Sequence, residues 1–388
     1  MCMLRHRTSN AGLVCVLWLA LYAPLPAQSP AAAGGTGEAT RLLKVDLPAD
    51  APVALVSADW GESRTAERGS ALVLDLHTSL SLRNVGSQRI RALTMLVVSQ
   101  DVTPGGRASV AKASLNIGTG ETFPIRIDLR LLRPLARPAG PLVEIALDGV
   151  LFEDLSFYGP NRLDSRRTMT AWELEAQRDR RWFQQVLAEA GTEGLRREVL
   201  ASLARQADRP RLEMEFARSG RATSVEADHP VQLAFLAVPG APVEAVAGMA
   251  RIAGNEARAP QVEVRSRAAK PVRYLEIGWL LRDVRGREYS AGSMPASLRL
   301  LPGTRERITQ SAALRFGEPG GAPVSIDSLT AFVSMVEFAD GGVWIPGRGA
   351  FEDPRLARAL GPGGEEERLT SIYRKKGLAA LLAELKKF

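Results

Sequence analysis

Apolar and polar residues alternate along most of the chain between residues 42 and 158. From Leu72 to Leu82, apolar residues or Thr78 occupy every second position, which places them on one face of a strand. Further alternating runs follow at 89–98, 117–129 and 142–152. Gly- and Pro-containing breaks separate these runs, and regularly spaced short strands with such turns are typical of a β-sandwich. We therefore expect a first sandwich domain over residues 42–165.

The spacing of apolar residues changes to that of a helix in the segment 166–208. Its apolar positions are Trp172, Ala176, Phe183, Val186 and Leu187, followed by Leu195, Val199, Leu200 and Leu203. Gly191 and Gly194 separate the two groups, which predicts two amphipathic helices with charged outer faces. This segment is expected to be a helical connector.

Strand patterning returns after the connector and predicts a second sandwich domain over residues 209–350. A helical segment over 351–388 ends the chain. Glutamates at its start and lysines at its end complement a helix macrodipole. Its leucines form one stripe, at Leu378, Leu381, Leu382 and Leu385. Packing of this stripe within the protein is favoured over contact with an anionic membrane surface, although a basic amphipathic helix permits both.

An internal repeat connects the two β-rich regions. Residues 80–101 and 262–283 align without a gap and share their apolar positions. Two more matched blocks follow in the same order, 114–125 with 297–308 and 152–162 with 338–348. The repeat predicts that Leu93 is equivalent to Leu275 and Phe152 to Phe338. The expected fold class is therefore mainly β with helical additions, as two tandem immunoglobulin-like β-sandwich domains, each followed by helix.

The N-terminal segment has the features of an export signal. Arg5 and Arg7 precede a short apolar run from Ala11 to Leu21, and small residues follow. We expect a signal peptide over 1–27, with an uncleaved anchor as the alternative, and a flexible leader over 28–41. Both cysteines, Cys2 and Cys15, lie in the signal. An exported chain whose mature part has no cysteine indicates a bacterial envelope protein, with domains large enough to fold without disulfides.

Charge and glycine placement exclude two classes of function. The net charge is +7, and basic and acidic residues are interleaved throughout. Nucleic-acid binding, which usually requires concentrated basic patches, is not expected. No glycine-rich loop follows a strand and opens a helix, so no nucleotide cofactor is predicted.

Asp154 and Asp340 occupy matching positions and could be catalytic acids or metal ligands. Asp340-Gly341 separates two apolar runs, however, which is a hairpin signal in which the Asp side chain binds its own backbone. Both residues are therefore predicted to have a structural role in turns.

A second turn pattern carries a family resemblance. The segment from Val262 to Asp283, followed by Gly286 and later by Leu300-Leu301-Pro302-Gly303, resembles the FxLyD-type and related immunoglobulin-like domains of bacterial envelope proteins. The first half keeps Asp101 but has Thr103-Pro104-Gly105-Gly106 at the turn. The resemblance implies an immunoglobulin-like fold and an extracytoplasmic setting, and it carries no catalytic residues.

Histidine usage argues against two common catalytic sites. Beyond the signal only His77 and His229 remain, at unmatched positions, with no cysteine beside them. A zinc site or a Ser-His-Asp triad is therefore disfavoured. His77 is expected to be exposed on its strand and His229 to lie in a polar loop. A hydrolase that uses two carboxylates remains open on residue types. No catalytic, cofactor-binding or metal-binding residue is assigned.

The aromatic residues allow two interpretations. Trp172, Trp182 and Phe183 could stack on a ligand, but their helical spacing favours docking of helix against sheet. Trp60, Trp279 and Trp344 are expected in the sandwich cores or at strand ends. The sequence thus favours an exported, non-enzymatic binding or structural protein whose partner is another envelope protein. The alternatives are a carboxylate-dependent carbohydrate-active hydrolase and a carbohydrate-binding protein.

Overall fold

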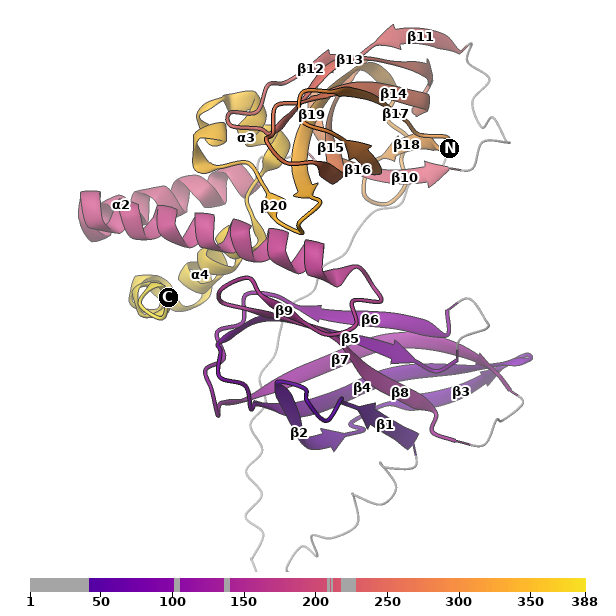
Figure 1. The fold of residues 1–388 in the computed structure, drawn as a ribbon, viewed down its shortest axis with the longest axis vertical. Helices are drawn as coiled ribbons and strands as arrows, with labels where there is room; N and C mark the ends of the chain where they lie inside the picture. The colour runs from indigo at the N-terminus through magenta and orange to yellow at the C-terminus, as the bar shows by residue number, and fades with distance from the viewer. Residues whose placement is uncertain (1–41, 101–104, 136–139, 208–209, 211, 218–227) are drawn as a thin grey trace, which may run out of the picture.

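Two β-rich units lie on opposite sides of a layer of helices (Figure 1). The computed structural model describes residues 42–388 except 101–104, 136–139, 208–209, 211 and 218–227. The predicted signal peptide 1–27 and leader 28–41 lie outside the described residues, as do Asp101 and Thr103. Mainly β structure with helical additions is confirmed.

The first β unit contains two sheets that face each other across one core. The first sheet has the order β1-β8-β5-β6 with β9 paired to β8, and comprises β1 (Leu43–Asp46), β5 (Ile90–Val98), β6 (Arg107–Lys112), β8 (Val143–Phe152) and β9 (Phe157–Tyr158). The second has the order β2-β4-β3 with β7 paired to β4, and comprises β2 (Val53–Asp59), β3 (Arg64–Arg68), β4 (Ala71–Asn84) and β7 (Thr122–Pro134). Four of the alternating leucines of β4 are fully buried against the opposite sheet, as period-two patterning predicts, namely Leu74, Leu76, Leu80 and Leu82; Leu72 is half-buried.

The second β unit repeats this arrangement with longer additions. One sheet has the order β12-β19-β15-β16 with β20 paired to β19, and comprises β12 (Ala234–Phe235), β15 (Val272–Asp283), β16 (Glu288–Leu300), β19 (Ile326–Phe338) and β20 (Val343–Trp344). The other has the order β10-β18-β14-β13-β11 with β17 paired to β14, and comprises β10 (Glu213–Ala217), β11 (His229–Gln232), β13 (Val243–Ala253), β14 (Glu256–Ser266), β17 (Arg305–Thr309) and β18 (Ala313–Gly317). Trp279 of β15 is fully buried in the shared core.

Strand pairing follows the sequence repeat residue by residue. Ile90 pairs with Phe152 in the first unit, and Val272 pairs with Phe338 at the aligned positions of the second. In each unit a short strand also runs parallel to the same edge, β1 along β8 and β12 along β19. Leu93 and Leu275 therefore lie in equivalent strands, as the alignment predicts.

The helical layer consists of α2 (Ser165–Ala207), η1 (Arg348–Glu352), α3 (Pro354–Leu360) and α4 (Gly364–Leu385). Gly191 breaks α2 and Gly377 breaks α4, each with a positive φ, so that each consists of two helical pieces. This break agrees with the two helices expected in the connector.

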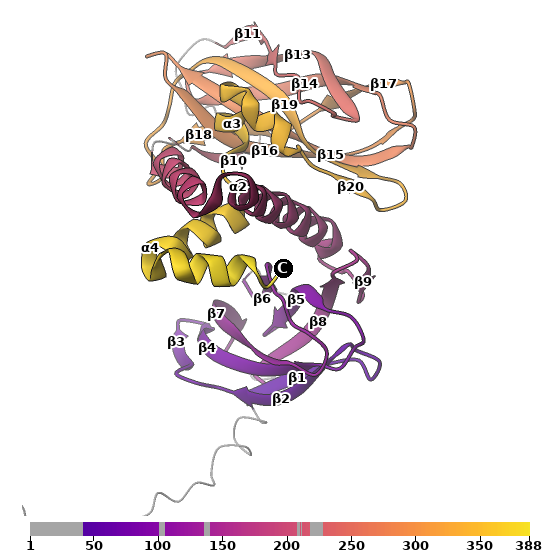
Figure 2. The same cartoon turned by 90° about the vertical axis from the view of Figure 1, so that its left-hand side faces the viewer.

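Apolar contact between α2 and α4 holds the layer together. Phe183 of α2 packs with Leu369, Leu381 and Leu385 of α4, and all four are at most 2% exposed. Part of the leucine stripe is thus covered within the chain. Figure 2 shows both helices between the two β units, with the C-terminus beside the first. Among the described helices, none combines the length and apolar character needed to cross a membrane.

Candidate functional site

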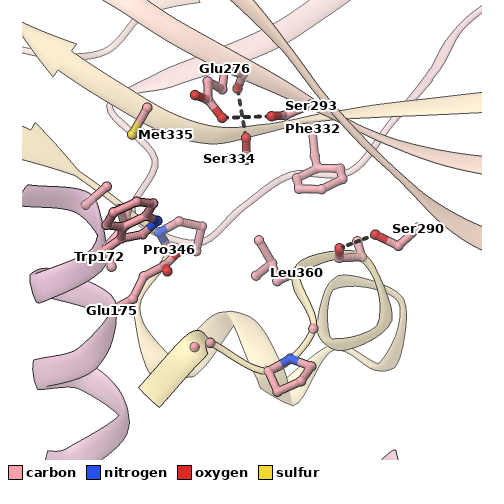
Figure 3. A pocket seen from close by; sticks show the side chains of 18 of the residues that line it. Trp172, Glu175, Glu276, Ser290, Ser293, Phe332, Ser334, Met335, Pro346 and Leu360 are labelled. Carbon is pink, nitrogen blue, oxygen red and sulfur yellow. Dashed lines mark hydrogen bonds between the residues drawn. The ribbon is translucent and has the colours of Figure 1, made fainter. Parts of the chain in front are cut away.

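A cleft of about 380 Å³ lies between α2, the outer face of the β15-β16-β19 sheet and the turn that joins α3 to α4. Its polar lining side chains come from several elements and are Thr168, Glu175 and Arg178 of α2, Glu276 of β15, Ser290 and Ser293 of β16, and Ser334 of β19. Figure 3 shows Glu175 and Trp172 on the helix side of this space and Glu276 on the sheet side.

The strand period places Glu276 in the cleft. Ile277 and Trp279 of β15 point into the core, so Glu276 and Gly278 occupy the opposite face. Hydroxyl groups fix the carboxylate of Glu276. Tyr274 Oη donates to its Oε1 at 2.9 Å, and Ser293 Oγ donates to its Oε2 at 2.8 Å. Glu276 is therefore held in one orientation at the cleft wall.

Gly278 leaves room for the Phe332 ring beside Glu276. A Cβ atom at Gly278 would lie 2.3 Å from Cζ of Phe332, which is closer than atoms can approach. The Phe332 ring occupies that space and forms an apolar part of the wall (Figure 3).

In the first β unit, α2 packs directly against the corresponding sheet face. Ala92, Thr94 and Leu96 stand at the positions that align with Tyr274, Glu276 and Gly278, and all three are buried. The Thr94 hydroxyl donates to Sδ of Met169, on the first turns of α2. Among the described residues, the open cleft lies beside the second unit, where Tyr274, Glu276 and Gly278 stand in place of these three buried residues.

Glu175 is the carboxylate on the helix side. Burial raises the pKa of Glu175 to about 7, against the opposing effect of the Arg178 charge, and the smaller effects of the Asp179 and Glu276 charges also raise it. Among the described residues Glu175 has no hydrogen-bond or ion-pair partner. Its carboxyl group is therefore half-ionised near neutral pH and free to bind a ligand.

Arg178 is already engaged. Its Nε donates to Asp179 Oδ1 at 2.9 Å, its Nη1 donates to the Pro346 carbonyl at 3.0 Å, and its guanidinium lies 4.9 Å from the Phe351 ring centroid. Arg178 thus stabilises the joint between α2 and the segment after β20. Its charge acts on both Asp179 and Glu175 and lowers the pKa of each against the effect of burial.

The two aspartates singled out in the sequence lie in turns, as predicted. Asp154 Oδ1 accepts from Ser156 N at 2.9 Å, and Asp340 Oδ1 accepts from Gly342 N at 2.9 Å. The hydrogen bonds from Ser156 lower the pKa of Asp154, and the hydrogen bond from Lys270 lowers that of Asp340. Neither residue lines the cleft.

The two histidines also lie away from the cleft. His77 is exposed, as expected, and its Nδ1 lies 2.9 Å from Asp128 Oδ1. The expectation of a polar loop at His229 is wrong, because this residue pairs with Ile252 as the first residue of β11. Within the described part of the chain, no cluster of three or more His, Cys, Asp or Glu side chains could hold a metal ion.

The aromatic residues of α2 depart from the predicted helix-to-sheet docking. Phe183 and Trp182 pack against α4 rather than a sheet, because a helical layer separates the two β units. Trp172 lines the cleft and is 39% exposed. Trp60 and Trp344 pack on the two cores as expected, and Trp279 is buried in one.

Comparison with known proteins gives only distant structural neighbours. No family model and no curated protein sequence matches the chain. A structure titled pT26-6p aligns over 86% of this chain and 72% of its own, with 8% identity and a TM-score of 0.18. A beta-glucosidase from Kluyveromyces marxianus, solved with glucose, aligns over 73% of this chain and 47% of its own, with 8% identity and a TM-score of 0.15.

Proposed function

We propose that this protein is an exported, non-enzymatic binding protein of the bacterial cell envelope, which holds another envelope protein in the cleft beside Glu276. The two β units serve as immunoglobulin-like sandwiches that support the helical layer. The features of an export signal at residues 1–27 and the two cysteines confined to that segment support the extracytoplasmic setting.

The cleft at the boundary between sheet and helices carries the proposal. Its volume of about 380 Å³ lies in the range of small-molecule and side-chain binding sites, roughly 300–1,000 Å³. Apolar walls at Phe332 and Trp172 surround a small number of fixed polar groups. Such a composition suits recognition of a partner segment, with apolar contact for affinity and polar groups for orientation.

A blocked cleft tests the proposal. Both cysteines lie in the predicted signal, so Thr168→Cys introduces a single reactive thiol at an exposed position on the cleft rim. We expect a bulky maleimide at this position to abolish capture of the partner from native envelope extracts. Thr65→Cys, exposed on β3 of the first unit, is the matched control and should capture the partner after labelling. Equal capture by both labelled variants would refute the cleft as the binding site.

A carboxylate-dependent hydrolase is the second candidate, because Glu175, whose pKa is raised, lines the same cleft as the carboxylate of Glu276. General acids of glycosidases have this property. The test is hydrolysis of nitrophenyl glycosides by the wild-type protein and by Glu175→Gln. Turnover that Glu175→Gln removes, with an unchanged melting temperature, would establish the enzyme; under our proposal neither protein turns over the substrate.

A further inference from the structure

The sheet that contains β13, β14 and β17 has an outer face rich in arginine. Val262 and Val264 of β14 are buried in the core of the second unit, so Glu263 and Arg265 point to the other side of the sheet. Figures 1 and 2 show β11, β13 and β14 on the side of this unit that faces away from the helices. This face is therefore separate from the cleft beside α2.

Four arginines surround two glutamates on this face. Glu263 lies 3.2 Å from Nη1 of Arg305 and 3.9 Å from Nη2 of Arg307. Glu244 contacts the guanidinium groups of both Arg265 and Arg267. We call these six residues the first arginine cluster. Each glutamate is shared by two arginines, so positive charge is in excess.

A second arginine cluster lies further along β14. Its members are Arg251, Arg258, Arg315, Asp228 and Glu256. Asp228 lies 3.0 Å from Arg251 and 3.8 Å from Arg258, and Glu256 lies 3.0 Å from Arg258 and 2.7 Å from Arg315. In the two clusters the arginine side chains are 27–66% exposed and the acids only 4–28%. The surface that meets the surroundings is thus mostly guanidinium.

Arginines stand directly opposite each other at two places on this face. Arg265 is the cross-strand partner of Arg305, and Arg251 is that of Arg258. Like charges at directly opposite positions destabilise a sheet. The shared acids offset this repulsion only in part, because seven arginines face four acids. A bound anion would offset the remainder.

The fold itself does not require these arginines. Thr122 and Pro124 of the first unit occupy the positions that align with Arg305 and Arg307. They pair with β4 in the same register in which the two arginines pair with β14. The same strand pairing therefore forms with neutral residues at these positions, and the arginines indicate a role beyond the fold.

A polar groove lies between the two arginine clusters. It has a volume of about 190 Å³, and its lining includes Gln232, Met249, Gln261 and Arg307. Gln261 lies between Arg258 and Arg265 along β14, which separates these arginines by roughly 20 Å at about 3.3 Å per residue. A ligand that reaches both clusters is therefore an extended chain. Side-chain amides in the groove can donate hydrogen bonds to its polar groups and accept hydrogen bonds from them.

We propose that the two arginine clusters and the groove between them bind an acidic polysaccharide, a linear chain of sugars that carry carboxylates. Guanidinium groups bind carboxylates through paired hydrogen bonds, and the glutamine amides suit sugar hydroxyls. A lipid surface fits this face less well, because binding in the membrane interface requires a set of apolar side chains. Among the groove residues that the structure describes, Met249 is the only large apolar one. The site is independent of the cleft and of the partner proposed for it.

Calorimetric titration of the purified full-length protein with polygalacturonate tests the inference. We expect polygalacturonate to bind and dextran, a neutral polysaccharide, to bind at least about tenfold more weakly, because charge-assisted hydrogen bonds are about twice as strong as neutral ones. Polygalacturonate binding should also weaken as NaCl is raised from about 50 to about 300 mM, since salt screens exposed charges. Equal binding of dextran, or binding that salt does not change, would refute the site.

A triple variant locates the contact while leaving the acids paired. Arg251→Gln, Arg265→Gln and Arg305→Gln together remove the three excess charges, and every acid of the two clusters keeps at least one arginine. The melting temperature should change little, because exposed ion pairs contribute little to stability. Affinity for polygalacturonate should fall by about tenfold or more.

The matched control removes three exposed arginines from the first unit, as Arg64→Gln, Arg68→Gln and Arg130→Gln. It should bind polygalacturonate like the wild type. Equal affinities of the two triple variants would show that the arginine clusters are not the binding site.

Two further measurements exclude other locations and ligands. Thr168→Cys with its maleimide should bind polygalacturonate like the wild type, and loss of binding would place the ligand in the cleft instead. Phosphatidylglycerol vesicles should bind more weakly than polygalacturonate. Vesicle binding that the first triple variant loses, with no binding of polygalacturonate, would make the face a lipid-binding surface and overturn the proposal.

Discussion

The guanidinium of Arg180 on α2 lies 4.1 Å from the ring centroid of Phe388, the last residue of the sequence. Arg91 of the first β unit lies 5.1 Å from the same ring. The C-terminal residues are also held by Asn116, whose side-chain amide donates to the Lys387 carbonyl at 3.1 Å. The end of the chain is thus part of the contact between the helical layer and the first β unit.

Phe388→Ala should lower the free energy of unfolding by about 2–3 kcal/mol, because it removes a partly buried ring and its interactions with arginine. Chemical denaturation measures this change. Lys386→Ala, an exposed neighbour, is the control and should change the stability by less than about 0.5 kcal/mol. Equal stability of the two variants would contradict a role for the tail in the fold.

Substitution of Arg180 in the buried ion-pair network beside the Phe388 ring should lower the stability more than Phe388→Ala does. Arg180 Nη2 lies 2.7 Å from Glu173, and Arg180 Nη1 lies 3.4 Å from Glu365, with all three side chains at most 4% exposed. Arg180→Met should destabilise the protein by about 3–5 kcal/mol, because it removes the nearest cation from the buried carboxylate of Glu173, whose remaining cation is Arg91 at 3.8 Å. Glu365 keeps its contact with Arg368 at 2.8 Å. Adding Glu173→Gln should recover part of the loss, since it removes the buried charge that has lost its closest partner.

Arg196→Met provides the comparison on the same helix. Arg196 makes an exposed contact with Glu193 at 3.9 Å, which should contribute at most about 1 kcal/mol. Thermal melts of the variants test this contrast. If Arg180→Met were as stable as Arg196→Met, the buried network would have no stabilising role.

The turn between β19 and β20 contains Gly341, and the backbone conformation of this glycine should affect the stability. Gly341 has φ +85°, and a Cβ atom there would lie 3.0 Å from Nη2 of Arg166. Gly341→Ala should therefore cost about 1–2 kcal/mol. Gly347→Ala, at an ordinary φ of −74° and in open space, should be close to neutral. Urea denaturation distinguishes the two, and equal midpoints would show that the turn does not require glycine.

The pH dependence of stability should reveal Glu175 without any ligand. Its pKa rises from the ordinary 4.5 to about 7 on folding, so between these values the folded chain holds more protons than the unfolded chain. Stability from this group is therefore lost as the pH rises through that window. The Gln side chain does not ionise, so Glu175→Gln does not undergo this loss of stability. It should therefore be more stable than the wild type by about 1–3 kcal/mol at pH 8.

Melting temperatures of wild type and Glu175→Gln across pH 4–8 test this prediction. The two proteins should have similar stability at pH 4, where the carboxyl group is protonated in both states of the wild type. A constant difference across the range would show that the substitution acts through packing rather than through charge.

The sheets and turns could be predicted from the sequence because their signals are local. Period-two alternation in β4 and the Asp340-Gly341 turn each depend on a few consecutive residues. The sequence repeat also predicted which strands of the two units are equivalent, since Leu93 and Leu275 align and lie in equivalent strands. The immunoglobulin-like assignment and the export signal remain predictions.

The cleft could not be predicted in the same way. Glu175 and Glu276 come from different elements, and only the packing of α2 over the outer face of β15 brings them together. One signal was available in the repeat. Tyr274-Leu275-Glu276 stands where the first copy has Ala92-Leu93-Thr94, so a carboxylate in the second copy takes the place of a threonine hydroxyl in the first.

The contact between Asn116 and Lys387 has a consequence for the order of folding. Its partners are separated by 271 residues, so it forms only after the segment from Asn116 to Lys387 has been synthesised. Until then, Arg91 of the first unit lacks the Phe388 ring, although its contacts with Glu153 and Asn116 lie within the first unit. The surface that Phe388 covers is therefore open while the second unit folds. Lys387 and Phe388 then complete the contact between the helical layer and the first β unit.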